Sequence, residues 1–256
     1  MVRKFFIFIL KYDKLVVVIG WLYYEKSFKK YLESIGVAPE KIFIGGMSAD
    51  SKGLRDAISS YSDERKELFK KKFQRGEDGL IYLFTGQLIK RKGIIPLLNA
   101  WKEHIKHHPN DSLIIVGDGE LMDACKNLSQ TETSIFLEGR VEYYNIYRYY
   151  AIADVYFLPT IEDNWSLVIP EAMACGLPVA TSIYNGCHPE LIHEGENGIT
   201  FDTFNHESMV NALDYFHHQD LKAMGRKSIE LEKPFNTVNC AKREFDAIVK
   251  LTKRIE

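Results

Sequence analysis

Two acidic residues frame a short loop in the stretch EDNWSLVIPEAMACGLPVA, residues 162–180. Asp163 lies in the loop itself, and Glu171 follows Pro170, a residue that suits the first turn of a helix. Paired carboxylates could carry out acid–base chemistry, or they could accept hydrogen bonds from two separate sets of hydroxyl groups. A simpler alternative is that Glu171 only complements the dipole of its helix, a contribution of about 0.3–1 kcal/mol.

The backbone between the two acids helps to decide among these alternatives. Ser166, Leu167 and Val168 offer N–H groups close to the expected helix start, and such groups suit a diphosphate. A carboxylate, a run of amides and a second carboxylate match, in order, a sugar, a diphosphate and a ribose. The combination favours binding of a sugar nucleotide over an acid–base pair or a helix-dipole contact.

Three adjacent cations, Lys90, Arg91 and Lys92, precede another expected helix. Cationic side chains and helix N–H groups together suit an anion, although a solvated turn is the better explanation when the trio is taken alone. The glycines of the stretch VGDGELM, residues 116–122, do not complete a dinucleotide-binding fingerprint, because Met122 occupies the third glycine position. A tight turn is the better interpretation of that stretch.

Strands and helices alternate regularly from residue 80, which predicts an α/β fold with a doubly wound, parallel, Rossmann-like sheet. In such sheets ligands bind at the carboxyl ends of the strands, where the acids and cations described above are expected to lie. The expected strands are 80–86, 112–119, 134–139, 155–159 and 178–182, and the expected helices are 93–108, 120–130, 145–153 and 170–176, with helical patterns from 206 onward. Before residue 80 we expect a strand at 14–20, a helix at 23–36, a strand at 41–46 and a charged helix at 64–76.

Composition limits the remaining classes of function. The chain has 256 residues and a formal net charge of −2, so no global basic field points to nucleic acid. Its four cysteines have no CxxC spacing, which favours free thiols in a reducing cytosol over metal ligands. The amino-terminal run FFIFIL is too short for a membrane-spanning helix. With Arg3 and Lys4 it would suit a membrane surface, and a buried edge of a domain is an equal alternative.

Five segments, in order, resemble the retaining family 4 glycosyltransferases of the GT-B fold. They match the family's G-[RQ]-L-x-x-x-K-G segment, its glycine turn, its F-x-G-x-V segment, its E-x7-E signature and its G-G-x-P-E segment. In this chain they read FTGQLIKRKGIIPLLNAW, LIIVGDGE, FLEGRV, PTIEDNWSLVIPEAMACGLPVA and NGCHPELIHEGENGITF. The resemblance covers residues 80–205 and implies a nucleotide-sugar donor domain with limits of 80–230. Residues 1–79 would be a remnant of the acceptor-side domain with its linker. Residues 231–256 would form a terminal helix that packs back towards the first part.

The resemblance also implies roles for individual residues. Glu171 would hold the donor ribose, Asp163 the transferred sugar, and Lys92 would neutralise the diphosphate; these three are the expected catalytic residues. The full expected donor site is Gly86, Gln87, Lys92, Arg140, Val141, Asp163, Ser166, Leu167, Val168 and Glu171. Within it, Arg140 and Val141 would flank the base.

This sequence departs from the family pattern at several positions. Asp163 replaces the usual first glutamate, and Gln87 stands where many members carry an arginine that touches phosphate. The glutamine can still donate a hydrogen bond, but some stabilisation of the leaving group would be lost. Trp165 and Ser166 replace phenylalanine and glycine, and Cys187 replaces a glycine, which matters only if that position needs a positive φ.

The implied activity is transfer of a sugar from a nucleotide diphosphate sugar to a glycan or lipid-linked acceptor with retention, in surface polysaccharide or glycolipid synthesis. No D-x-D motif occurs, so we expect no metal and no cofactor in the reaction. The expected location is the cytoplasm, with peripheral contact at the inner face of the membrane.

Two alternatives stay open. The chain could be a catalytically incomplete nucleotide-sugar-binding module, or a fragment that needs a partner chain to supply the missing domain. An NAD-dependent oxidoreductase is the weaker alternative, because the dinucleotide fingerprint is absent.

Overall fold

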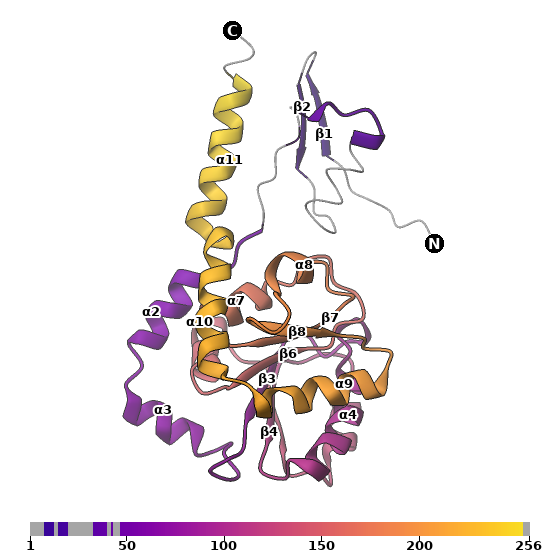
Figure 1. Ribbon diagram of the computed structural model, residues 1–256, viewed down its shortest axis with the longest axis vertical. Helices are drawn as coiled ribbons and strands as arrows, with labels where there is room; N and C mark the ends of the chain where they lie inside the picture. The colour runs from indigo at the N-terminus through magenta and orange to yellow at the C-terminus, as the bar shows by residue number, and fades with distance from the viewer. Residues whose placement is uncertain (1–7, 13–14, 20–32, 40–41, 43–46, 253–256) are drawn as a thin grey trace.

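The computed structural model describes residues 8–12, 15–19, 33–39, 42 and 47–252. Its body is a six-stranded sheet in which every neighbouring pair is parallel, in the order β5-β4-β3-β6-β7-β8 (Figure 1). The strands are β3 (Ile81–Thr85), β4 (Ser112–Val116), β5 (Ile135–Gly139), β6 (Val155–Leu158), β7 (Val179–Ser182) and β8 (Gly198–Phe201). This order is that of a doubly wound Rossmann-like sheet and confirms the predicted fold class.

The central strands are apolar because helices cover both of their faces. Every residue of β3, β4, β6 and β7 is buried, which explains why their sequences show continuous hydrophobic runs and not alternation. The sequence patterns did not predict β8, an edge strand in which Gly198 and Phe201 are buried but the two residues between them are only partly buried. All five predicted strands of this sheet are present.

Helices pack against both faces of the sheet (Figure 1). One set brings α4 together with α5 and α9, and the other brings α7 together with α2 and α10, with α6 beside α2. The helices of the sheet domain are α4 (Ile94–His107), α5 (Met122–Ser129), α6 (Tyr143–Tyr150), α7 (Val168–Ala174), α8 (His188–Leu191), α9 (His206–Asp214) and α10 (Leu221–Glu232), with short 3₁₀ turns η2 (Lys90–Lys92), η3 (Tyr215–His218) and η4 (Lys233–Phe235).

Two helices that precede the sheet pack into the same core. They are α2 (Ser51–Ser59) and α3 (Asp63–Lys70). Leu54 of α2 and Phe69 of α3 are buried in one hydrophobic cluster with the strands. Ser51 donates to the buried carboxylate of Glu232, and Arg55 pairs with that carboxylate at 3.1 Å. The expected boundaries of the chain's parts remain predictions.

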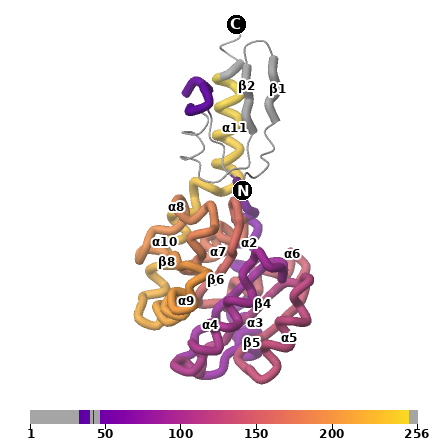
Figure 2. The backbone as a smooth tube through the Cα atoms, turned by 90° about the vertical axis from the view of Figure 1, so that its right-hand side faces the viewer, coloured from indigo at the N-terminus to yellow at the C-terminus, as the bar shows by residue number. Residues whose placement is uncertain are grey.

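The segments just before α2 and just before α11 run side by side. Ala49 and Asn236 form a parallel bridge, and the Thr237 hydroxyl donates to the Ala49 carbonyl at 3.0 Å. From there α11 (Thr237–Thr252) extends away from the sheet domain (Figures 1 and 2).

The amino-terminal segment differs in part from the expectation. β2 (Leu15–Ile19) falls on the expected strand, but it pairs antiparallel with β1 (Phe8–Tyr12) in a separate two-stranded sheet. The helix expected at 23–36 and the strand expected at 41–46 lie largely outside the described residues, as do Arg3 and Lys4.

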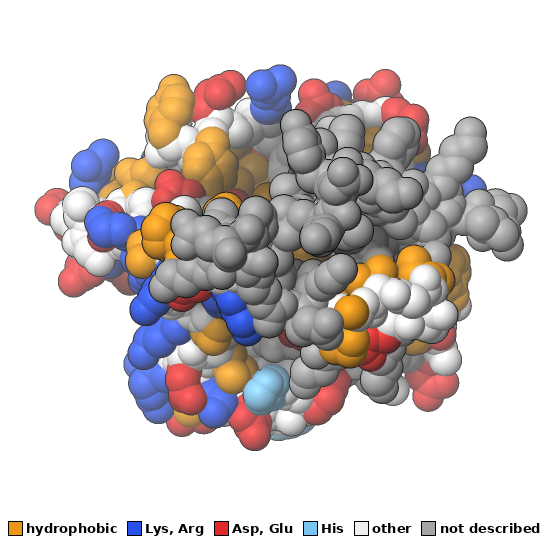
Figure 3. Space-filling view, turned by 90° about the horizontal axis from the view of Figure 1, so that it is seen from above, with side chains coloured by type: hydrophobic (Ala, Val, Ile, Leu, Met, Phe, Trp, Pro, Cys, Tyr) orange, Lys and Arg blue, Asp and Glu red, His pale blue; other side chains and the backbone are white. Residues whose placement is uncertain are grey.

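The described surface mixes both signs of charge. On the face seen from above, Lys and Arg side chains lie among those of Asp and Glu (Figure 3). None of the helices in the described part of the chain combines the length and hydropathy that a bilayer-spanning segment needs.

Candidate functional site

The predicted site residues gather where the strands of the sheet have their carboxyl ends. Gly86 and Gln87 directly follow β3, Arg140 follows β5, and Asp163 and Glu171 follow β6. Because the strands are parallel, their carboxyl ends lie together, and the strand order reverses between β3 and β6. The sheet therefore places the candidate site at the topological switch point, where open α/β sheets bind ligands.

Lys92 and Asp163 form the central contact of the site. Lys92 Nζ lies 2.5 Å from Asp163 Oδ2, and both side chains are largely buried, with 12% and 11% of their area exposed. Arg91 approaches the same oxygen at 3.6 Å from a more exposed position. Two cations thus face one carboxylate, so these three side chains together carry a net positive charge.

Gly93 holds the cationic turn against the end of β6. Its φ is +69°, and a Cβ added there would lie 1.8 Å from the Pro159 carbonyl oxygen. Two residues before Gly93, the Arg91 carbonyl accepts hydrogen bonds from the Ile161 N–H at 2.7 Å and from the Thr160 hydroxyl at 2.9 Å. A side chain at position 93 would collide with the Pro159 carbonyl. Only glycine therefore lets the turn that carries Lys92 pack against the end of β6.

Backbone contacts fix Asp163 from the other side. Its carbonyl accepts from the Gly186 N–H at 2.8 Å, and its Oδ1 accepts from the Trp165 N–H at 3.2 Å. The neighbouring Cys187, which replaces a family glycine, is buried and has a φ of −86°. That backbone suits any residue, so the cysteine introduces no strain.

Glu171 is buried in the first turn of α7, with 7% of its area exposed. Tyr143 donates to its Oε1 at 3.2 Å, and Tyr150 donates to its Oε2 at 3.0 Å. Burial raises the pKa of Glu171, the two tyrosine hydroxyls lower it, and Asp50 raises it further. The net pKa is raised, which shows that desolvation outweighs the two hydrogen bonds.

The loop between the two acids contains polar groups without partners. The Ser166 hydroxyl and the Trp165 indole N–H are buried and have no hydrogen-bond partner among the described residues. α7 begins at Val168, two residues before the predicted start, so Pro170 lies inside the first turn and not at its first position. Leu167 caps the helix and is 38% exposed. An unpaired hydroxyl and the amides of a helix start therefore lie beside each other.

Three glycines line the sheet edge with backbone. The Gly86 N–H donates to the Val116 carbonyl at 3.0 Å, and the Gly117 N–H donates to the Gly139 carbonyl at 2.8 Å. A Cβ on Gly117 would lie 1.8 Å from the Gly86 carbonyl oxygen. The ends of β3 and β4 can approach this closely only because Gly117 has no side chain.

Not every predicted residue points into this cluster. The Arg140 side chain is 80% exposed and lies 3.8 Å from Glu142, and Gln87 is also exposed. Val141 is partly buried against the core. Arg140 and Val141 come shortly before Tyr143, which contacts Glu171.

Sequence reasoning missed several neighbours of the site. Tyr143 and Tyr150 contact Glu171 from α6, and Asp50 acts on it from the start of α2. The tyrosines do share one helix face, being seven residues apart, but no local pattern links that face to Glu171. Arg91 was seen only as part of the basic trio.

The comparisons with known proteins agree with this arrangement. The family model described as "Glycosyl transferases group 1" matches residues 65–230, which include every residue of the candidate site. The chain belongs to this glycosyltransferase family. The match confirms the resemblance found in the sequence.

Characterised relatives are longer than this family member. It is 27% identical over 181 residues to the alpha-monoglucosyldiacylglycerol synthase of Acholeplasma laidlawii, covering 69% of this chain and 45% of the relative. It is 28% identical over 189 residues to an Escherichia coli UDP-Gal:alpha-D-GlcNAc-diphosphoundecaprenol alpha-1,3-galactosyltransferase, covering 71% of this chain and 46% of the relative. The chain thus spans about half the length of the curated relatives it matches.

Solved structures share its fold. A glycosyltransferase from Rickettsia africae has a TM-score of 0.73 at 18% identity, covering 89% of this chain and 67% of the other. The Anabaena protein HepE, solved in complex with UDP and glucose, has a TM-score of 0.66 at 17% identity, covering 89% and 61%. At these identities the likeness shows a GT-B-like fold.

Proposed function

We propose that this chain binds a nucleotide diphosphate sugar at the β3–β6 switch point and takes part in transferring the sugar, with retention, to a glycan or lipid-linked acceptor. The observation that carries the proposal is the pairing of Lys92 with Asp163 beside the start of α7. A cation, unpaired donors and a buried carboxylate then lie in the order that diphosphate and ribose require.

Each group has a distinct task in this proposal. The donor diphosphate draws Lys92 away from Asp163, and the Ser166 hydroxyl and the amides of Leu167 and Val168 donate to its oxygens. Glu171 accepts hydrogen bonds from the ribose hydroxyls, and Asp163, released from Lys92, accepts from the transferred sugar. Negative charge grows on the diphosphate as it leaves, so Lys92 and Arg91 stabilise the transition state more than the bound donor.

The acceptor is assigned by likeness alone. The names of the Acholeplasma and E. coli relatives describe a glycolipid synthase and an enzyme acting on a lipid-linked sugar. We assign this chain to the same kind of acceptor, with peripheral contact at a membrane. Protein cations supply the positive charge in the proposed transfer, so it uses no metal or other cofactor.

Calorimetry with UDP and GDP tests donor binding by the whole chain. Binding of either nucleotide, lost in Glu171→Ala, supports the proposal, and the absence of binding to both contradicts it. A transfer assay with labelled nucleotide sugars then separates the two functional alternatives. Product from the purified chain identifies an enzyme, whereas binding without product identifies a donor-binding module that needs a partner chain.

A further inference from the structure

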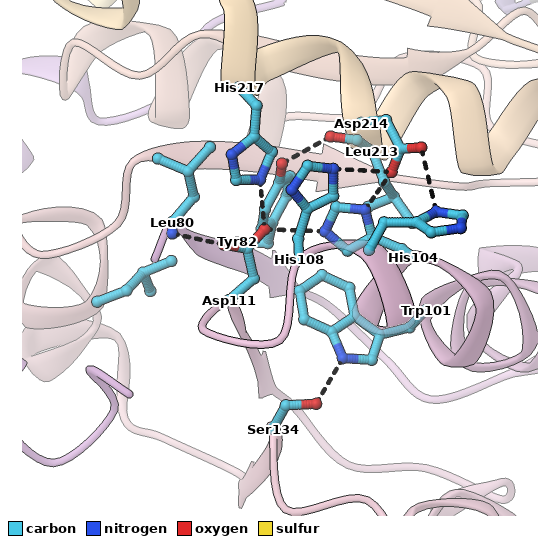
Figure 4. A network of polar contacts seen from close by, with 12 residues as sticks. Leu80, Tyr82, Trp101, His104, His108, Asp111, Ser134, Leu213, Asp214 and His217 are labelled. Atoms are coloured by element: carbon cyan, nitrogen blue, oxygen red, sulfur yellow. Dashed lines mark hydrogen bonds and ion pairs between the residues drawn. The ribbon is translucent and has the colours of Figure 1, made fainter. Parts of the chain in front are cut away.

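A second cluster of titratable side chains, drawn in Figure 4, lies at the amino ends of the strands. His104 is in the last turn of α4, Asp111 immediately precedes β4, and His217 lies in η3. Asp111 is therefore at the amino end of β4, whereas the candidate donor site is at the carboxyl ends. The five residues of a strand, about 17 Å in length, separate the two ends.

Three side chains of this cluster converge on one point. His104 Nε2 lies 2.9 Å from Asp111 Oδ2, and His217 Nε2 lies 2.7 Å from the same oxygen. The three atoms all lie within 4.8 Å of one another. His104 and Asp111 are buried, while the His217 side chain is 16% exposed. The point of convergence is therefore enclosed by protein but reachable from solvent past His217.

Further contacts orient each of the three side chains. The Leu80 N–H donates to Asp111 Oδ1 at 2.8 Å, so the other carboxylate oxygen faces the histidines. His104 Nδ1 lies 2.5 Å from Asp214 Oδ1, an arrangement typical of metal-binding histidines, whose second ring nitrogen donates to a carboxylate. The His217 ring stacks on His108 with centroids 3.7 Å apart.

A divalent cation would neutralise the carboxylates of this cluster. Asp111 and Asp214 contribute two carboxylates, and the ion-pair partners that the structure describes for them are all histidines. No described lysine or arginine pairs with either carboxylate. A divalent ion bound by neutral imidazoles would balance the two negative charges.

We propose that His104 Nε2, His217 Nε2 and Asp111 Oδ2 bind one Zn²⁺ ion, with water as the fourth ligand. Imidazole and carboxylate ligands in this number suit zinc, whose bonds of about 2.0–2.1 Å place tetrahedral ligands about 3.3 Å apart. The observed spacings are those of hydrogen bonds, so the ligands must separate by about 0.5 Å and release the bridging protons to solvent. His217 can supply this movement because it lies in a short turn at the surface.

The ion would join three separate elements. It would tie the end of α4 to the start of β4 and to η3, the turn that continues α9. α9 already packs against α4. The site would therefore stabilise the packing of the chain's last third against the sheet, and it is independent of the proposed sugar transfer.

Titration of the chelator-treated full chain with Co²⁺, followed by Zn²⁺, tests the proposal. We expect one Co²⁺ per chain with the visible absorption of a tetrahedral site, which Zn²⁺ displaces. At about 100 times its dissociation constant, Zn²⁺ should raise the unfolding midpoint by about 5–10 °C. An absence of stoichiometric binding by the wild-type chain would overturn the proposal.

Variants locate the binding to this cluster. His217→Ala should abolish the Co²⁺ absorption, and Asp214→Asn should weaken binding about 10–100-fold by removing the partner that orients His104. His193→Ala is the matched control, because that histidine is 45% exposed and pairs with Glu196 elsewhere on the surface. His217 is the chosen ligand variant since its partial exposure lets the chain fold without it. Wild-type binding in His217→Ala would place the ion elsewhere and overturn the assignment.

Discussion

Lys92 Nζ and Asp163 Oδ2 are 2.5 Å apart, so the cation and the carboxylate of the candidate site are paired with each other. A diphosphate must therefore compete with Asp163 for Lys92. Arg91, 3.6 Å from the same oxygen, can keep part of the contact with Asp163 when Lys92 turns towards a ligand. The pairing holds the lysine in place before a donor arrives.

Replacing Lys92 by alanine should weaken UDP or GDP binding about 10–100-fold, because a charge-assisted hydrogen bond contributes about 1.5–3 kcal/mol. Binding of uridine or guanosine should change little, since these lack the phosphates. Calorimetry with each nucleotide and its nucleoside measures the difference. Lys90→Ala, an exposed residue of the same turn, is the control. Equal losses for nucleotide and nucleoside would rule out a phosphate contact for Lys92.

Glu171→Gln should weaken nucleotide binding about 10–100-fold while it raises the unfolding midpoint at neutral pH. The folded-state pKa of Glu171 is raised, chiefly by burial. The associated stability is present in acid, below the unfolded pKa, and is lost as the pH rises through the folded pKa. Glutamine never ionises. The unfolding midpoints of the two proteins should therefore differ most above the folded-state pKa of Glu171 and least below its unfolded pKa. Thermal unfolding of both across the acidic range measures this, and a gap that widens towards low pH would contradict it.

Tyr143→Phe should tighten nucleotide binding about 2–10-fold. The Tyr143 hydroxyl donates to Glu171 Oε1, where we place a ribose hydroxyl, and a neutral hydrogen bond contributes about 0.5–1.5 kcal/mol. Its removal should also lower the free energy of unfolding by a similar amount. Tyr144→Phe provides the matched control, because the neighbouring ring is 74% exposed. If Tyr143→Phe binds nucleotide more weakly than the wild type, the tyrosine contacts the ligand and does not compete with it.

Gly93→Ala and Gly139→Ala form a matched pair for the cationic turn. Their φ angles are +69° and +68°, so alanine suffers the same backbone strain at both, about 1–2 kcal/mol. Only at Gly93 would the added Cβ meet another group, the Pro159 carbonyl oxygen. Gly93→Ala should therefore lose clearly more free energy of unfolding than Gly139→Ala, by about 2 kcal/mol or more. Equal losses in urea denaturation would show that the turn relaxes away from β6.

The sheet could be predicted from the sequence because its central strands are buried on both faces. Unbroken apolar runs such as that of β4 have few alternatives when helical patterns separate them. The partly buried β8 gives no such run, and it was missed. The rule that ligands bind at the carboxyl ends of parallel strands then places Lys92 and Asp163 at one edge, although 71 residues separate them.

The partners of the predicted residues could not be found in the same way. Tyr143 and Tyr150 meet Glu171 only after α6 and α7 have packed, and the sequence shows no sign of that contact. The same holds for His104 and His217, which lie far apart in the sequence, in α4 and in η3. A local pattern predicts which side chains share an element, whereas tertiary packing decides which ones meet.

The bridge between Ala49 and Asn236 means that the chain enters and leaves the sheet domain at one point. The closed unit between these residues includes the whole candidate donor site. Units whose two ends lie together tolerate insertion into other proteins and joining of their ends by a short linker. Residues 49–236 therefore form a unit that could be inserted into another protein, or closed by a linker between its ends, without disturbing the order of its strands.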